Sequence, residues 1–141
     1  MPTTVPRTAR LDLSIVEDYM HAGVVTCDVQ APLTEVAGLL ADARIHCVVV
    51  AGLATTSNGT RLTWGTLTDV DLLRALDRGE GAVTAGTVAA TEIVTVTEDV
   101  TIARVVQLMS EHEVSHLIVV EQDFPVGVIS SLDVARAAAR S

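Results

Sequence analysis

The chain has 141 residues, of which 49% are hydrophobic and 19% are charged, so a single folded domain is expected and a disordered chain is excluded. The formal net charge is −9, which argues against nucleic acid as a partner. All nine basic residues are arginine, and chemistry that needs a catalytic lysine is therefore excluded.

The sequence contains no membrane or secretion signal. Its longest apolar run, Cys47–Ala51, is far shorter than the roughly 18 residues that a membrane-spanning helix needs. The N-terminal residues lack the apolar stretch of a signal peptide. Two cysteines, Cys27 and Cys47, are too few for a disulfide framework. A cytoplasmic protein without membrane contact is expected.

The first half of the chain predicts an alternation of helices and strands. Apolar residues at Leu33, Val36, Ala37 and Leu40 have the period of an amphipathic helix, whereas short β-branched runs indicate strands. The stretch 52–61, rich in Gly, Ser, Thr and Asn, is expected to be a hairpin loop. The expected elements are a helix over 14–20, a strand over 24–27, a helix from Leu33, strands over 47–51 and 61–67, and a helix capped by Thr68.

The second half repeats this order. The segment that starts at Val24 matches the segment that starts at Ile93 without a gap over 26 residues, at an offset of 69. After the next strand the offset falls to 62, so the extra residues of the first half fall in 52–61. The expected elements are a helix over 84–91, a strand over 93–96, a helix from Ile102, strands over 117–121 and 126–129 with a tight turn at 122–125, and a helix capped by Ser130.

The duplicated pattern predicts the fold class. Each half has the order β-α-β-β-α, and such a unit leaves one sheet face bare. Two copies can cover these faces against each other with pseudo-twofold symmetry, which predicts an α/β (α+β) fold. We expect a tail at 1–13, the first repeat at 14–78, and a linker with the second repeat at 79–140.

Each half ends on the same polar motif. A glycine in a strand lets another group approach the backbone, and a hydroxyl at the following helix N-terminus favours a phosphate. A carboxylate one turn later can accept hydrogen bonds from ribose hydroxyls, and an arginine on the same face can reach a phosphate. The two copies are Gly65-x-x-Thr68-x-x-Asp71-x-x-Arg74 and Gly127-x-x-Ser130-x-x-Asp133-x-x-Arg136.

Present twice at this spacing, the motif resembles that of the tandem CBS-domain family, or Bateman modules, and the resemblance covers residues 14–140. The opening Val16–Met20 followed by Val24–Thr26 is also typical of that family. The resemblance implies two CBS repeats in one stand-alone module, without catalytic activity or a required cofactor. It implies a regulatory sensor that binds AMP, ADP, ATP or S-adenosylmethionine in clefts between the repeats, forms a homodimer, and acts on a separate, unidentified protein.

The resemblance also assigns roles to particular residues. Asp71 and Asp133 would hold ribose, Thr68 and Ser130 would meet the phosphate, and no metal ligand is expected. The family often has an arginine beside His46 and His116, which this chain lacks, and that weakens the case for a triphosphate. The expected ligand-binding residues are Val25, Thr26, His46, Thr68, Asp71, Arg74, Val94, Thr95, His116, Ser130, Asp133 and Arg136.

Other interpretations of the same residues stay open. Asp71 and Asp133 can simply stabilise the first turn of their helices, or pair with the arginine three residues later. The clefts would then be empty, in a scaffold for protein interaction or dimerisation. A small enzyme is the least favoured alternative, because no nucleophile and base form a recognisable pair. His21 and His112 are expected to be solvated.

Overall fold

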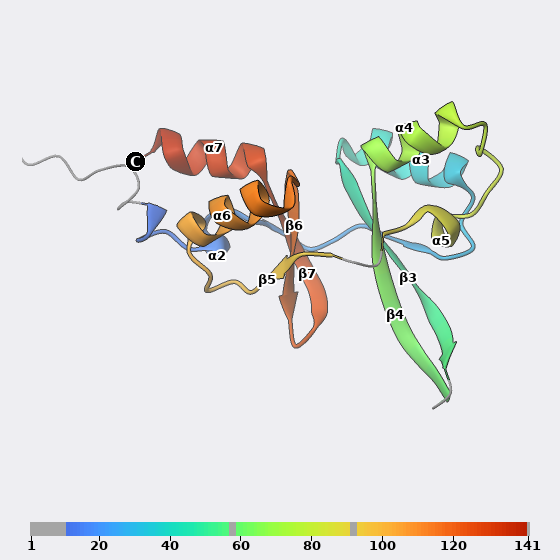
Figure 1. Ribbon diagram of the computed structural model, residues 1–141, viewed down its shortest axis with the longest axis horizontal. Coiled ribbons are helices and arrows are strands. Elements are labelled where there is room, and N and C mark those ends of the chain that lie inside the picture. The colour runs from blue at the N-terminus through green and yellow to red at the C-terminus, as the bar shows by residue number, and fades with distance from the viewer. Residues whose placement is uncertain (1–10, 57–58, 91–92, 141) are drawn as a thin grey trace, which may run out of the picture. The chain divides into compact units, whose positions relative to one another are not determined.

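The computed structural model describes residues 11–56, 59–90 and 93–140 (Figure 1). The chain divides into two compact units. Unit 2 is the continuous segment Val24–Ile93, whereas unit 1 combines the N-terminal segment that ends at Gly23 with the chain from Val94 onward. Each unit has its own sheet and helices, and the expected mixed fold with two repeats is confirmed.

Unit 2 is built on a three-stranded sheet in the order β2-β3-β4. β2 runs parallel to β3, and β3 pairs antiparallel with β4. The apolar stripe of α3 is buried through Leu33, Val36 and Leu40, which form one core cluster with Val48, Val50 and other residues of the unit. Its elements are β2 (Thr26–Asp28), α3 (Leu33–Ala43), β3 (Cys47–Thr56), β4 (Gly59–Thr68), α4 (Asp69–Asp77) and α5 (Ala85–Val88).

Unit 1 is built on a four-stranded sheet in the order β1-β7-β6-β5. β5 runs parallel to β6, and the other neighbouring strands are antiparallel. α6 buries Ile102, Val105 and Met109, the counterparts of the buried positions in α3. Its elements are α2 (Val16–Tyr19), β1 (His21–Ala22), β5 (Thr95–Val96), α6 (Ile102–His112), β6 (His116–Glu121), β7 (Phe124–Ser130) and α7 (Ser131–Ala139).

The duplication is visible in local backbone geometry. α3 and α6 each have 11 residues and each ends at a C-cap in the left-handed region, with φ of 53° at both Arg44 and Glu113. These two residues are related by the sequence offset of 69. Left-handed backbone is uncommon outside glycine, so its occurrence at matching residues supports two copies of one unit.

The hairpin of the first repeat is lengthened as strand and not as loop, which corrects the expectation for 52–61. β3 continues to Thr56 and β4 begins at Gly59, with Thr55 opposite Thr60. The threonines of this stretch are β-branched and suit extended strands, which outweighs its loop-like composition. In Figure 1 the hairpin β3–β4 is visibly longer than β6–β7, which turns at Gln122 and Asp123 with positive φ at both.

The leading helix of each repeat is shorter than expected, and the chain that follows it pairs with a strand. The helices expected over 14–20 and 84–91 shorten to α2 and α5, of four residues each. In unit 1 the chain then extends, and His21 pairs with Val128 of β7. In unit 2, Ala90 exchanges backbone hydrogen bonds with Thr66, at N···O distances of 2.8 and 2.9 Å. The first segment thus adds the edge strand β1 to its sheet, whereas the second makes a single bridge to β4.

Three expectations are only partly covered by these observations. Residues 1–10 of the expected tail, and Thr91 of the second leading helix, lie outside the described residues. The repeat boundaries 14–78 and 79–140 stay a prediction about the duplicated sequence, and the compact units do not follow them. In the described part of the chain, no helix combines the length and the apolar character needed to cross a bilayer.

Candidate functional site

The two motif glycines make room for the protein's own backbone. A Cβ atom on Gly65 of β4 would lie 2.6 Å from the carbonyl oxygen of Ala90. A Cβ atom on Gly127 of β7 would lie 2.6 Å from the carbonyl oxygen of His21. Both distances are shorter than any normal contact of a Cβ atom. The close approach that the sequence predicted is therefore made by the leading segments, which pair with β7 in unit 1 and with Thr66 of β4 in unit 2.

The hydroxyl and the carboxylate of each motif form a reciprocal helix cap. In α4 the backbone N–H of Thr68 donates to Asp71 Oδ2 at 2.9 Å, and the N–H of Asp71 donates to Thr68 Oγ1 at 3.2 Å. Ser130 and Asp133 repeat this in α7, at 2.8 and 3.3 Å. The N-caps expected at Thr68 and Ser130 are confirmed. Loss of such a cap costs about 0.5–2 kcal/mol.

Asp71 retains an oxygen that the cap does not use. Its side chain is half-buried, and Oδ2 accepts the Thr68 hydrogen bond. Oδ1 has no hydrogen-bond or ion-pair partner among the residues that the structure describes, and Arg74, exposed one turn further along α4, forms no ion pair with it. The arrangement leaves a carboxylate oxygen beside the N-terminal turn of α4.

His46 lies next to the same helix terminus. Its Nδ1 atom is 2.7 Å from Asp69 Oδ2, and its carbonyl oxygen accepts the backbone N–H of Asp69 at 2.9 Å. The following residue, Cys47, is buried, and burial together with the charges of Asp71 and Asp69 raises the pKa of its thiol to about 12. Cys47 is therefore a protonated thiol at neutral pH and not a nucleophile.

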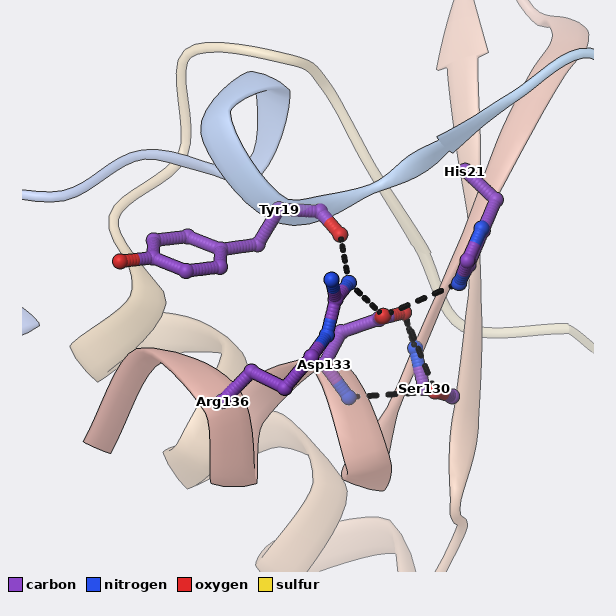
Figure 2. Close-up of polar contacts among 5 residues, drawn as sticks. All are labelled: Tyr19, His21, Ser130, Asp133 and Arg136. Carbon is purple, nitrogen blue, oxygen red and sulfur yellow. Dashed lines mark hydrogen bonds and ion pairs between the residues drawn. The ribbon is translucent and has the colours of Figure 1, made fainter. Parts of the chain in front are cut away.

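Asp133 lies at the centre of a much denser cluster (Figure 2). Only 1% of it is exposed, and its Oδ2 accepts from the N–H and the hydroxyl of Ser130 at 2.8 and 3.0 Å. Its Oδ1 accepts from the guanidinium of Arg136 and lies 3.1 Å from Nε2 of His21. The same Arg136 nitrogen donates to the carbonyl oxygen of Tyr19 at 3.1 Å.

These contacts set the acidity of Asp133. Burial alone would raise the pKa of its carboxyl group, because it penalises the charged form. The hydrogen bonds from Ser130 and Arg136, together with the charge of His21, outweigh burial and lower this pKa below its ordinary value. Asp133 is therefore a fully ionised, partnered carboxylate at neutral pH.

The remaining expected site residues lie within the unit of their own repeat. Thr26 and Thr95 are exposed on the short strands β2 and β5. The carbonyl oxygens of Val25 and Val94 accept the N–H groups of Val49 and Ile118, at 2.8 and 3.4 Å.

His116 opens β6, with Nδ1 3.0 Å from the Ser115 hydroxyl. The twelve expected ligand-binding residues therefore divide into two sets of six, one in each unit. The set of unit 2 is Val25, Thr26, His46, Thr68, Asp71 and Arg74, and the set of unit 1 is Val94, Thr95, His116, Ser130, Asp133 and Arg136.

Sequence reasoning missed the part played by the leading segment. His21 was expected to be solvated, and 70% of its side chain is exposed, yet its ring contacts Asp133. The offset of 69 places Ala90 where His21 stands in the first repeat, and this difference was visible in the sequence. The contact of His21 with Asp133 could not be inferred from this difference, because it depends on the pairing of β1 with β7, which joins segments more than 100 residues apart.

The described residues do not gather ligands for a metal ion. Across 11–56, 59–90 and 93–140, no three His, Cys, Asp or Glu side chains come together in such an arrangement. Cys27 and Cys47 are both free thiols.

Known protein families and solved structures share this architecture. The family model for the CBS domain matches residues 16–78 and again 85–140. A CBS domain pair in complex with 5′-methylthioadenosine and S-adenosyl-L-methionine is 23% identical, with a TM-score of 0.76, and the match covers 90% of this chain and 97% of that one.

Hypoxic Response Protein I with two coordinated zinc ions is 27% identical, with a TM-score of 0.68 over 87% of this chain and 98% of that one. The CBS domain of a bacterial CNNM/CorC family Mg2+ transporter in complex with ATP is 17% identical, with a TM-score of 0.73 over 94% and 92%. No curated protein matches the chain. With two matches to the family model that together span most of its length, the chain belongs to the CBS-domain family.

Proposed function

We propose that the protein is a non-catalytic regulatory module that binds an adenosyl ligand, with AMP, ADP, ATP and S-adenosylmethionine as the candidates. The observation that supports this most directly is the unpaired Oδ1 of Asp71, on a half-buried carboxylate at the start of α4. A carboxylate so placed can accept hydrogen bonds from a ribose diol. Two CBS-domain structures similar to this chain hold adenosyl ligands.

The charges around Asp71 favour a ligand with few phosphates. Asp69 and Asp71 both lie in the first turn of α4, and the imidazole of His46 is already paired with Asp69. Arg74 is the arginine of the same motif that is open to an anion. One guanidinium beside two carboxylates suits AMP or the cationic S-adenosylmethionine better than ATP, because repulsion grows with the charge of the ligand.

The side chains at the site are suited to binding a ligand and not to catalysing a reaction on it. The hydroxyls of Thr68 and Ser130 accept hydrogen bonds within helix caps, and Cys47 is held as a neutral thiol. A bound ligand would act by favouring one state of the module over another, to the extent that its affinity for the two states differs. The regulated protein would be a separate cytoplasmic chain.

Thermal unfolding in the presence of nucleotides tests this function. AMP or S-adenosylmethionine at 100 times its dissociation constant should add about 2.7 kcal/mol to the free energy of unfolding and raise the melting temperature. GMP and ribose 5-phosphate, which lack the adenine, should give a much smaller shift. The change Asp71→Asn should remove about half of the shift or more, since it weakens binding by about tenfold or more. Flat melting curves across AMP, ADP, ATP and S-adenosylmethionine would contradict the proposal.

A second candidate function, self-association, is supported by exposed apolar residues on two helices. Leu73 of α4 is 64% exposed with Val70 and Leu76 exposed on the same helix, and Leu132 of α7 is 71% exposed. Large exposed apolar side chains that cluster on one helix are typical of surfaces that another protein covers. We propose that these helices form the contacts of a homodimer. A scaffold without ligand would keep this contact and show no effect of Asp71→Asn on melting with nucleotides.

A further inference from the structure

The two copies of the motif differ in what stands beside the carboxylate. His21 pairs with Val128 of β7, and Ala90 pairs with Thr66 of β4. These pairs correspond to each other by the offsets of 69 and 62 that relate the repeats. The second repeat therefore has a methyl group where the first has an imidazole. Arg136 bonds to Asp133, whereas its counterpart Arg74 does not bond to Asp71.

The hydrogen-bonding capacity of Asp133 is used up within the protein. An ionised carboxylate offers about four acceptor positions. Those of Asp133 face the N–H and hydroxyl of Ser130, the guanidinium of Arg136 and the ring of His21, as Figure 2 shows. A ribose could reach this buried carboxylate only by displacing one of these partners, and the loss of a hydrogen bond from a buried ion is costly.

The cluster around Asp133 also holds residues 19–23, the end of the leading segment, against β7 and α7 of unit 1. Arg136 joins Asp133 to the carbonyl oxygen of Tyr19, and the Arg140 guanidinium lies 5.8 Å from the centroid of the Tyr19 ring. The N–H of Gly23 donates to the carbonyl oxygen of Val126 at 2.7 Å. In unit 2 the counterpart of Arg140 is Arg78, which pairs instead with Glu80 at 2.9 Å.

We infer that the two motif copies perform different tasks. Asp133 is an internal latch that holds the leading segment on β7 and α7 and is closed to ligand. Asp71, with its open Oδ1, is the carboxylate that receives the ribose. The chain therefore binds one adenosyl ligand, through unit 2. The ligand part of this inference rests on the proposed function, whereas the latch part does not.

Calorimetric titration of the full chain with AMP and with S-adenosylmethionine tests the ligand part. We expect one ligand per chain, and a loss of affinity of about tenfold or more in Asp71→Asn, the range expected for a hydrogen bond to a charged group. Asp133→Asn should keep the stoichiometry and the affinity within about threefold, as should Asp77→Asn, a control at the exposed end of α4. Two ligands per wild-type chain would overturn the assignment, and so would loss of binding in Asp133→Asn alone.

Hydrogen exchange of backbone amides tests the latch part without any ligand. Arg136→Met removes the contacts to Asp133 and Tyr19 while it leaves the Ser130 cap in place, and His21→Ala removes the imidazole alone. Both should speed exchange in the peptide that covers residues 19–23, with strands β3 and β4 unchanged. Arg74→Met, the matched control in unit 2, should change neither region. Unchanged exchange over 19–23 in Arg136→Met would overturn the latch.

The titration and the hydrogen exchange measurement together distinguish a failure of this inference from a failure of the proposed function. If wild type binds neither probe, the proposed function fails and the ligand part falls with it, while the exchange measurements still decide the latch. If wild type binds a probe through Asp133, the proposed function stands and the inference is wrong. Melting of each variant without ligand shows that any loss of binding comes from a folded protein.

Discussion

Asp71 and Asp133 occupy equivalent sequence positions, but contacts from outside the motif give them different chemistry. Both start as the N3 residue of a capping box. The sequence predicts the helix cap, because a cap involves residues that are only three positions apart. The pairing of Asp133 with Arg136 was one of the alternatives that the sequence left open, and the structure confirms it. The imidazole of His21 was not predicted as a partner, since its position depends on a strand that begins 112 residues earlier.

The pH dependence of stability should report on Asp133. Its folded-state pKa is lowered, so the unfolded chain, with an ordinary value of about 3.9, takes up a proton at higher pH than the folded chain does. The stabilisation is therefore complete well above pH 3.9 and is lost as the pH falls through the folded-state pKa. Urea unfolding of Asp133→Asn should show a weaker acid dependence below about pH 4 than wild type does. Parallel profiles for the two proteins would contradict this account.

Helices and strands were predicted well wherever a buried stripe fixes their period. α3 and α6 lie where the apolar spacing placed them, because one face of each is covered by a sheet. The shortened leading helices, and strand β1, were not predicted, because two residues carry no periodicity and their conformation is set by backbone pairing with β7. The extended hairpin was misread because its composition resembles that of a loop.

A single methyl group at a motif glycine should disturb the edge of its sheet. Gly127→Ala places a Cβ atom against the carbonyl oxygen of His21, and relief requires movement of β1. We expect a loss of about 1–3 kcal/mol in the free energy of unfolding, the usual cost of overpacking. Gly38→Ala is the control, since a Cβ atom there meets nothing within 4 Å in the interior of α3. It should stabilise the protein by about 0.5–1 kcal/mol. Urea denaturation measures both, and a neutral Gly127→Ala would show that β1 moves freely.

At the scale of the whole molecule, the duplication was readable in the sequence but the partition into compact units was not. The constant offset identifies two copies, and the family model matches both. The partition follows from the edge strands, since β1 comes from the first repeat and pairs with β7 of the second. No local pattern in residues 19–23 specifies the sheet that they join.

Self-association is the property of the whole molecule that the exposed helix residues predict. Leu73→Asp and Leu132→Asp each place a charge on an exposed apolar position of α4 and α7. Sedimentation velocity should show a dimer for wild type and a shift toward monomer in each variant, because burial of an unpaired charge is unfavourable. Phe124→Asp, at an exposed position at the start of β7, is the control and should remain dimeric. A monomeric wild type would refute the proposed interface.

The pairing of β1 with β7 has a consequence for the order in which the protein is completed during translation. Domains generally fold as units as they emerge from the ribosome, N-terminal parts first. Here the continuous segment Val24–Ile93 can close as soon as it has emerged, whereas β1, although made earlier, has no partner until residues 124–130 are synthesised. Strand β1 is therefore among the last elements to be secured, and a nascent chain stalled before β7 would leave Tyr19 and His21 exposed to the solvent and to chaperones.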